Sequence, residues 1–205
     1  GTEELLKEAK YNADRGVLRY SIVTSGRCLS DREVERLCDS IRKIKEETDI
    51  RICVSPGLLQ EEQFRKLKEA GADRVHCNLE SSERYFPQVC TTHTYEEKTA
   101  AIQAAKRAGL SVCSGGILGL GESVEDRIDM VLTARKLGVR SIPVNVLNPI
   151  PGTSLREESG AVRRRDTPVH WRSFGFDSGW IIRLAGGRGL MEDKGKKCFQ
   201  SGANA

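Results

Sequence analysis

The spacing of apolar residues along the first 146 positions alternates between two periods. Residues 17–24 form a β-branched and aromatic run that stops at the turn-forming pair Ser25-Gly26, which is typical of a strand. Ser30 and Glu33 form a capping box, and apolar side chains at helical spacing follow it. The cycle repeats, and it predicts strands over residues 49–54, 74–78, 110–114 and 141–146, with helices over about 60–70, from 94, and around 128–132.

This alternation favours an α/β domain with a parallel sheet. Gly71, Gly109 and Gly138 mark the helix-to-strand turns, as expected for repeated β-α units. An eight-unit barrel and an open sheet both satisfy the pattern. The chain has 205 residues, short of the ~250 typical of a complete barrel, so an incomplete barrel is one solution.

Residues 156–180 differ in character from the rest of the chain. They carry both tryptophans and the run Arg163-Arg164-Arg165, but show neither helical nor strand periodicity. We expect an atypical, poorly packed segment, either disordered or out of frame with the remainder. Regular patterning resumes at residues 181–184 and continues into a last helix that ends near Ser201.

The net charge, the hydropathy and the cysteine content of the chain disfavour several classes of function. A formal net charge of +4, dispersed along the chain, does not favour nucleic-acid binding. No apolar run approaches the ~20 residues of a membrane span, and the first residues lack the basic and apolar regions of a secretion signal. The expected location is therefore the cytoplasm. The seven cysteines then favour reduced thiols or cluster ligands over disulfides.

Three cysteines lie at comparable depth in neighbouring predicted strands. Cys53, Cys77 and Cys113 are separated by 24 and 36 residues, as adjacent strands of a β-α repeat would place them. Each alone is more often a buried apolar residue than a ligand, but three together favour an iron–sulfur site, because thiolates are the usual ligands of such clusters. The other four lie in helical patterns, where packing is the simpler reading, or in undecided loops: Cys38 and Cys198, then Cys28 and Cys90.

A glycine-rich segment over residues 115–122 follows a predicted strand and precedes a helix. Glycine lets a backbone approach a ligand closely, although such turns are common and this one lacks the dinucleotide-binding spacing. Asn78 and Glu80 are two residues apart and so face the same way, which suits polar recognition at a strand end. His76 and His93 are more often structural groups than ligands or bases.

These residues resemble the biotin synthase family of radical S-adenosylmethionine enzymes, over residues 19–155 and 181–205. The most specific matches are Asn-Leu-Glu at 78–80, Tyr-Phe-Pro at 85–87, Thr-Thr-His-Thr-Tyr at 91–95, Cys-Ser-Gly-Gly-Ile at 113–117, Pro-Val-Asn at 143–145, Pro-Gly-Thr at 151–153 and Arg-Leu-Ala-Gly-Gly-Arg at 183–188. The resemblance implies a TIM-type (β/α) barrel with parallel strands, here one partial domain over residues 1–205 truncated at both ends.

The resemblance also implies an auxiliary iron–sulfur cluster that donates sulfur. It places cluster ligands at Cys53, Cys113 and Arg183, and it leaves Ser21 where the family has a further cysteine. Cys77 is expected to replace that missing thiol. The residues around Ser21 resemble those of the anaerobe-associated branch of the family, so the auxiliary cluster is expected to be [2Fe–2S] or a variant.

The remaining site residues follow from the same resemblance. S-adenosylmethionine is expected against Asn78, Glu80 and Lys98 and along the turn that contains Gly116, Ile117 and Gly119. The ureido ring of dethiobiotin, the implied substrate, is expected against Asn78 and Asn145, which are the predicted catalytic positions. A reducing electron-transfer protein and a homodimer are implied as partners, with no nucleic acid and no membrane.

One requirement of the family is not met within these 205 residues. Its radical chemistry needs a Cys-x3-Cys-x2-Cys loop to hold a [4Fe–4S] cluster, and that spacing does not occur. We therefore expect that cluster only in a longer parent protein, and an inactive chain on its own. The alternatives are a related radical maturase or mutase acting on another small molecule, or a non-catalytic remnant that binds an iron–sulfur cluster.

Overall fold

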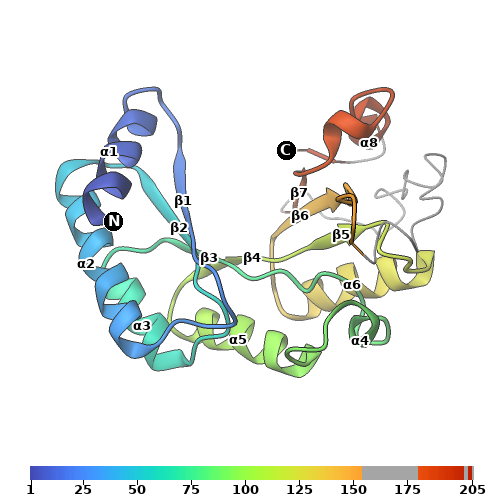
Figure 1. The fold of residues 1–205 in the computed structure, drawn as a ribbon, viewed down its shortest axis with the longest axis horizontal. Helices are drawn as coiled ribbons and strands as arrows, with labels where there is room; N and C mark the ends of the chain where they lie inside the picture. The colour runs from blue at the N-terminus through green and yellow to red at the C-terminus, as the bar shows by residue number, and fades with distance from the viewer. Residues whose placement is uncertain (154–179, 201–202, 205) are drawn as a thin grey trace. The chain divides into compact units, whose positions relative to one another are not determined.

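The computed structural model describes residues 1–153, 180–200 and 203–204. Two compact units make up the chain (Figure 1). The first comprises residues 1–77 and 96–112, and the second comprises residues 78–95 and 113–205. The expectation for residues 156–180 falls, apart from Trp180, outside the described residues.

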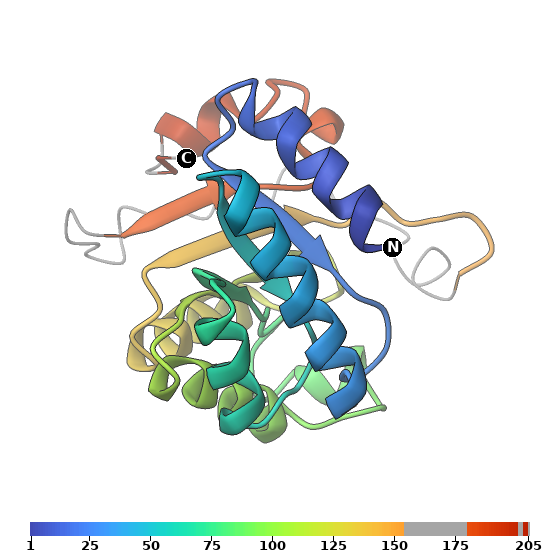
Figure 2. The same cartoon turned by 90° about the vertical axis from the view of Figure 1, so that its left-hand side faces the viewer.

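The first unit is a parallel sheet covered by helices. Its elements are α1 (Thr2–Ala13), β1 (Arg19–Val23), α2 (Asp31–Glu47), β2 (Arg51–Ser55), α3 (Glu61–Glu69), β3 (Arg74–His76) and all but the first residue of α5 (Tyr95–Arg107). β1 pairs with β2 and β2 with β3, both in parallel. Helix α2 lies between α1 and α3 (Figure 2).

The pattern of α2 explains why it forms and where it packs. Ser30 caps its first turn, and the Ser30 backbone N–H donates to the Glu33 carboxylate at 2.8 Å. The apolar residues at helical spacing are all buried, and Val34, Ile41 and Ile44 are fully inaccessible. Burial of such a side chain contributes about 1.5–3 kcal/mol, so this one stripe fixes the helix against the sheet.

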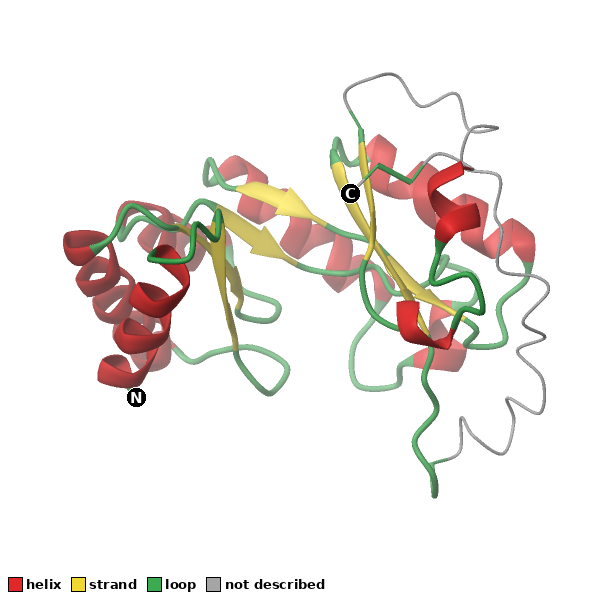
Figure 3. Ribbon diagram, turned by 90° about the horizontal axis from the view of Figure 1, so that it is seen from above, coloured by secondary structure: helices red, strands yellow, loops and turns green. Residues whose placement is uncertain are grey.

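The second unit is built around a central strand, β6 (Ser141–Val146). It also contains α4 (Phe86–Val89), β5 (Gly116–Leu118), α6 (Val124–Lys136), β7 (Ile181–Leu184), η2 (Arg188–Leu190) and α8 (Lys196–Gln200), and β4 (Ser111–Cys113) leads into it. Strands β4, β5 and β7 all pair with β6 in parallel, and the strands are yellow in Figure 3.

Strands β4 and β5 are two pieces of one interrupted strand. Cys113 pairs with Ser141, and Gly116 pairs with Val144, so the same register continues across the break. Gly115 lies in the break, and a Cβ built on it would be 1.8 Å from the Pro143 carbonyl oxygen and 3.1 Å from the Pro143 nitrogen. Proline cannot donate a ladder hydrogen bond, so the strand is interrupted where it faces Pro143.

The outer side of β7 is occupied by Asn204. Its side-chain oxygen accepts from the Ile182 N–H at 2.9 Å, and its own N–H donates to the Ile182 carbonyl at 3.0 Å. Its side-chain nitrogen donates to the Trp180 carbonyl at 2.8 Å. One residue thus pairs with β7 in the manner of a short neighbouring strand.

The predicted elements are present, and α1, α4, β5 and η2 are additional to them. The five predicted strands correspond to β1, β2, β3, β4 and β6, and the last helix, α8, ends at Gln200. Helix α1 was not predicted, and β5 was interpreted as part of a glycine-rich turn. None of the helices in the described ranges combines the length and apolarity that a membrane span requires.

Candidate functional site

The candidate site lies in the second unit, where residues 78–80 run alongside β5. The Glu80 N–H donates to the Gly115 carbonyl at 3.0 Å, and the Ile117 N–H donates to the Glu80 carbonyl at 3.0 Å, which is a parallel bridge. The Asn78 side-chain oxygen accepts from the Gly115 N–H at 3.1 Å. These contacts bring the predicted Asn78, Glu80 and Ile117 together at the end of the interrupted strand.

Glu80 has an unusual backbone. Its φ is +69°, in the left-handed region that a non-glycine residue rarely adopts. Such a conformation costs on the order of 1–3 kcal/mol and persists only where surrounding contacts determine it, often at functional sites. The bridge to β5 supplies those contacts, and the Asn78 side-chain nitrogen lies 3.5 Å from the Glu80 carboxylate.

Close backbone packing explains Gly115, in the break, and Gly116, in β5. A Cβ on Gly116 would be 2.3 Å from both the Glu80 carbonyl oxygen and the Met130 sulfur. Only glycine permits the chains to approach this closely. The close approach accounts for Gly115 and Gly116 without a ligand, so a cofactor contact at Gly116 stays a prediction.

Asn145, predicted from the same resemblance, joins this group from β6. Its side-chain oxygen accepts from the Gly186 N–H at 2.8 Å, and its side-chain nitrogen lies 3.5 Å from the Gly116 carbonyl oxygen. The two amides, Asn78 and Asn145, thus contact the consecutive glycines 115 and 116. This convergence places two neutral hydrogen-bonding side chains, capable of both donating and accepting, beside a half-buried carboxylate.

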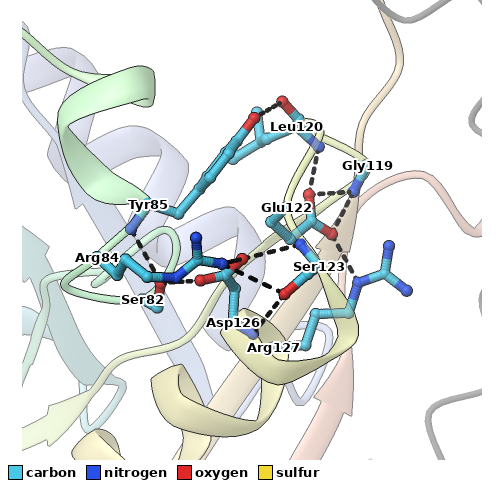
Figure 4. Close-up of polar contacts among 9 residues, drawn as sticks. All are labelled: Ser82, Arg84, Tyr85, Gly119, Leu120, Glu122, Ser123, Asp126 and Arg127. Carbon is cyan, nitrogen blue, oxygen red and sulfur yellow. Dashed lines mark hydrogen bonds and ion pairs between the residues drawn. The ribbon is translucent and has the colours of Figure 1, made fainter.

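A buried carboxylate fixes the turn that follows β5 (Figure 4). Glu122, whose side chain is 2% exposed, accepts from the Gly119 N–H at 2.9 Å and the Leu120 N–H at 2.7 Å. Arg127 donates to the same carboxylate at 2.7 Å. Gly121, with φ of +103°, completes the turn, and a Cβ there would be 2.4 Å from the Tyr85 hydroxyl.

A second buried carboxylate joins this turn to the segment that follows Glu80 (Figure 4). Asp126 is 1% exposed, and it accepts from the Ser82 hydroxyl at 2.5 Å, the Arg84 guanidinium at 2.6 Å and the Ser123 N–H at 2.9 Å. Burial by itself would raise the pKa of Asp126, but the hydrogen bonds from Ser82 and Ser123, with the charge of Arg84, lower the pKa overall.

Together the two carboxylates hold two loops in fixed relation. Residues 78–85 carry Asn78 and Glu80, and residues 115–122 carry the glycine turn; Tyr85 adds a hydrogen bond from its hydroxyl to the Leu120 carbonyl at 3.0 Å. This network is not apparent from local sequence patterns, although Ser123 and Asp126 form a capping-box pattern that marks the start of α6.

The predicted cluster ligands are divided between the units. Cys53 of β2 lies in the first unit, where it is the register partner of Ser21 in β1. Cys113 of β4 and Arg183 of β7 lie in the second unit and are register partners of Ser141 and Pro143. Among the described residues, no group of three or more His, Cys, Asp or Glu side chains could hold a metal ion.

The expectation that Cys77 replaces the thiol missing at Ser21 stays a prediction. Cys53 is the register partner of Arg74, so Arg74 and His76 share its face of the sheet. β3 ends at His76, so this alternation does not extend to Cys77, which follows the strand and is buried. Lys98, the remaining predicted residue, lies in α5 within the first unit.

Comparison with known proteins identifies the class. A model of the radical SAM superfamily matches residues 1–134, and the chain belongs to this superfamily. The solved structure of methylornithine synthase matches all of the chain and 60% of its own length, with a TM-score of 0.79 and 20% identity. A maturase of the [FeFe]-hydrogenase matches 77% of the chain and 38% of its own length, with a TM-score of 0.64. These likenesses confirm the expected fold class, parallel strands of the radical SAM barrel type.

Relatives of similar sequence narrow the comparison to one family of enzymes. The chain is 54% identical to Biotin synthase 2 of Corynebacterium diphtheriae and 52% identical to the biotin synthase of Brachyspira hyodysenteriae, in each case over 99% of the chain. It spans 62% and 61% of the length of these relatives.

Proposed function

We propose that the chain is part of a biotin synthase, which inserts sulfur into dethiobiotin. The observation that carries the proposal is the convergence of Asn78, Glu80 and Asn145 on the Gly115-Gly116 junction, in a chain about half identical to biotin synthases. In the whole protein, S-adenosylmethionine and a [4Fe–4S] cluster would supply the radical that takes hydrogen from dethiobiotin, and an auxiliary cluster would supply the sulfur.

The residues of the second unit suit the binding steps. The half-buried Glu80 carboxylate can accept hydrogen bonds from the two ribose hydroxyls of the cofactor. Ile117 offers an apolar contact beside it, and the backbone of Gly116 in β5 and of Gly119 just after β5 is proposed to contact the cofactor. Lys98 is proposed as a further cofactor contact from α5.

Asn78 and Asn145 would orient the substrate. A ureido ring offers N–H donors and a carbonyl acceptor, and a side-chain amide can complement both. Each amide already contacts backbone groups here, Asn78 through its oxygen and Asn145 through oxygen and nitrogen. That support holds their orientation before a ligand arrives, which reduces the ordering cost of binding.

For the auxiliary cluster we propose Cys53, Cys113 and Arg183 as ligands. Cys53 and Cys113 are buried, which suits thiolates that hold a cluster away from solvent. Cys77, which is also buried, is proposed to replace the thiol missing at Ser21.

Binding to the purified chain tests the proposal. After anaerobic reconstitution with iron and sulfide, calorimetry should show that the chain binds S-adenosylmethionine and dethiobiotin at the same time. Asn145→Ala should weaken the binding of dethiobiotin and leave the binding of S-adenosylmethionine intact. The exposed substitution Gly189→Ala is the matched control. A bound cluster with no affinity for dethiobiotin would favour the alternatives, a radical enzyme for another small molecule or a non-catalytic cluster-binding protein.

Two proposed partners can be examined on the same material. The radical chemistry requires a one-electron reductant, which we propose to be a small electron-transfer protein. A homodimer, also proposed from the family resemblance, would be detected by sedimentation velocity.

A further inference from the structure

A cluster of polar side chains that the proposed function does not use follows α4. Cys90 is the C-terminal cap of that helix, and its N–H donates to the Phe86 carbonyl at 3.0 Å. The Cys90 sulfur lies 3.4 Å from Nδ1 and 3.7 Å from Nε2 of His93. Thr92 lies between them, with its hydroxyl 3.4 Å from the sulfur and 3.0 Å from His93 Nδ1.

This geometry suits a thiolate. Both ring nitrogens of His93 lie within reach of the sulfur, so in either tautomer the unprotonated nitrogen can take the thiol proton, and the resulting imidazolium can stabilise the thiolate. The Thr92 hydroxyl can donate to the sulfur as well. The imidazole is held in place, because its ring packs against the buried ring of Phe86 with centroids 5.6 Å apart.

Cys90 differs from the other thiols of the described residues in the combination of its solvent exposure and its contacts. Cys38 and Cys198 are buried in helices, and burial raises the pKa of each thiol. Cys28 is exposed, but its side chain makes no hydrogen bond in the described part of the chain. Cys90 is half-buried, and it combines partial exposure with a contacting imidazole.

We propose that Cys90, activated by His93, is a thiol modification site that reacts with small-molecule disulfides. The Cys90 sulfur attacks one sulfur of R–S–S–R, a Cys90–S–S–R bond forms, and the second sulfur leaves as R–S⁻. The leaving thiolate takes the proton that His93 removed from Cys90. The disulfide is the oxidant, so one R–S group is reduced to a thiol as Cys90 is oxidised, and no other reactant is needed.

Competition between cysteines of one molecule tests this proposal. The reduced chain is treated with a trace of iodoacetamide at neutral pH, and peptide mass spectrometry follows alkylation of each cysteine. We expect Cys90 to react at least about tenfold faster than Cys28, because the thiolate is the reactive form. Oxidised glutathione, used as the disulfide probe, should give a mixed disulfide at Cys90 before any other position.

Two controls separate activation from simple exposure. His93→Gln should lower the Cys90 rate to that of Cys28, while the Cys28 rate in the same molecule stays unchanged. In 6 M guanidinium chloride the wild-type rate ratio should fall to about one, because the local arrangement is lost. Equal rates at Cys90 and Cys28 in the folded wild-type chain, or a Cys90 rate that His93→Gln leaves unaltered, would overturn the proposal.

Discussion

Ser21 and Cys53 are register partners at the centre of the β1–β2 pair, so their side chains point to the same face of the sheet. Replacement of Ser21 by cysteine would therefore add a thiol next to a proposed cluster ligand. We expect Ser21→Cys to increase the iron and sulfide retained after anaerobic reconstitution, because thiolates are stronger cluster ligands than a serine hydroxyl. Cys77→Ala is the comparison, and it should lower the retained iron, because Cys77 is the proposed replacement for the missing thiol.

The proposed ligands themselves give a second prediction. Cys53→Ala and Cys113→Ala should each abolish cluster binding, measured as iron content and visible absorbance, because each removes a thiolate that the cluster needs. Cys38→Ala is the matched control, since Cys38 is equally buried but lies in α2. Iron content unchanged in the Cys53 and Cys113 variants would refute the ligand assignment.

The Asp126 contacts differ in expected strength. Ser82→Ala removes a hydrogen bond between two buried groups and leaves the carboxylate under-satisfied, which should lower the free energy of unfolding by about 1–3 kcal/mol. Arg84→Ala removes a partner whose side chain is 70% exposed, so its effect should stay within about 1 kcal/mol. Urea denaturation measures both. An Arg84 effect larger than the Ser82 effect would contradict this ranking.

The same carboxylate should make stability depend on pH. Because the folded pKa of Asp126 is lowered, its stabilisation is fully present above the unfolded pKa of about 3.9 and is lost as the pH falls through the lower folded value. The Asp126→Asn variant has no carboxylate at this position, so its stability has no pH-dependent contribution from residue 126. The difference in unfolding free energy between wild type and this variant should therefore be constant near neutral pH and shrink below about pH 4, as followed by chemical denaturation at each pH.

Substitution of Gly116 by alanine tests the close packing of residues 78–80 against β5. Alanine there would place a methyl group against the Glu80 carbonyl and the Met130 sulfur, and the overpacking should cost about 1–3 kcal/mol of stability. Gly189→Ala, where a Cβ meets nothing within 4 Å, should change stability by no more than about 0.5 kcal/mol. Similar thermal midpoints for the two variants would show that residues 78–80 do not lie as close to β5 as described.

Local pattern predicted most of the fold because each β-α unit carries its own signal. Helix α2 illustrates this, since its capping box and its buried stripe are both visible in the sequence. Strand β5 was missed because its glycine reads as a turn residue, whereas its conformation depends on β6 and on Glu80, which are distant in sequence. Tertiary pairing overrides local propensity in such a segment.

The candidate site was predicted unevenly for a related reason. Asn78, Glu80 and Asn145 were found by resemblance to a family motif, and the structure brings them to one junction. The contact of Ser82 with Asp126 spans 44 residues, so no local spacing reveals it. The pairing of Ser21 with Cys53 became visible only with the register of β1 and β2.

The contacts of Asn204 have a consequence for behaviour at high concentration. An uncovered strand edge displays free N–H and C=O groups and can template pairing with another molecule, which leads to aggregation. Asn204 engages both backbone groups of Ile182 and the carbonyl of Trp180, so these three groups cannot pair with a foreign strand. By occupying these edge groups, the single residue Asn204 limits self-association through β7.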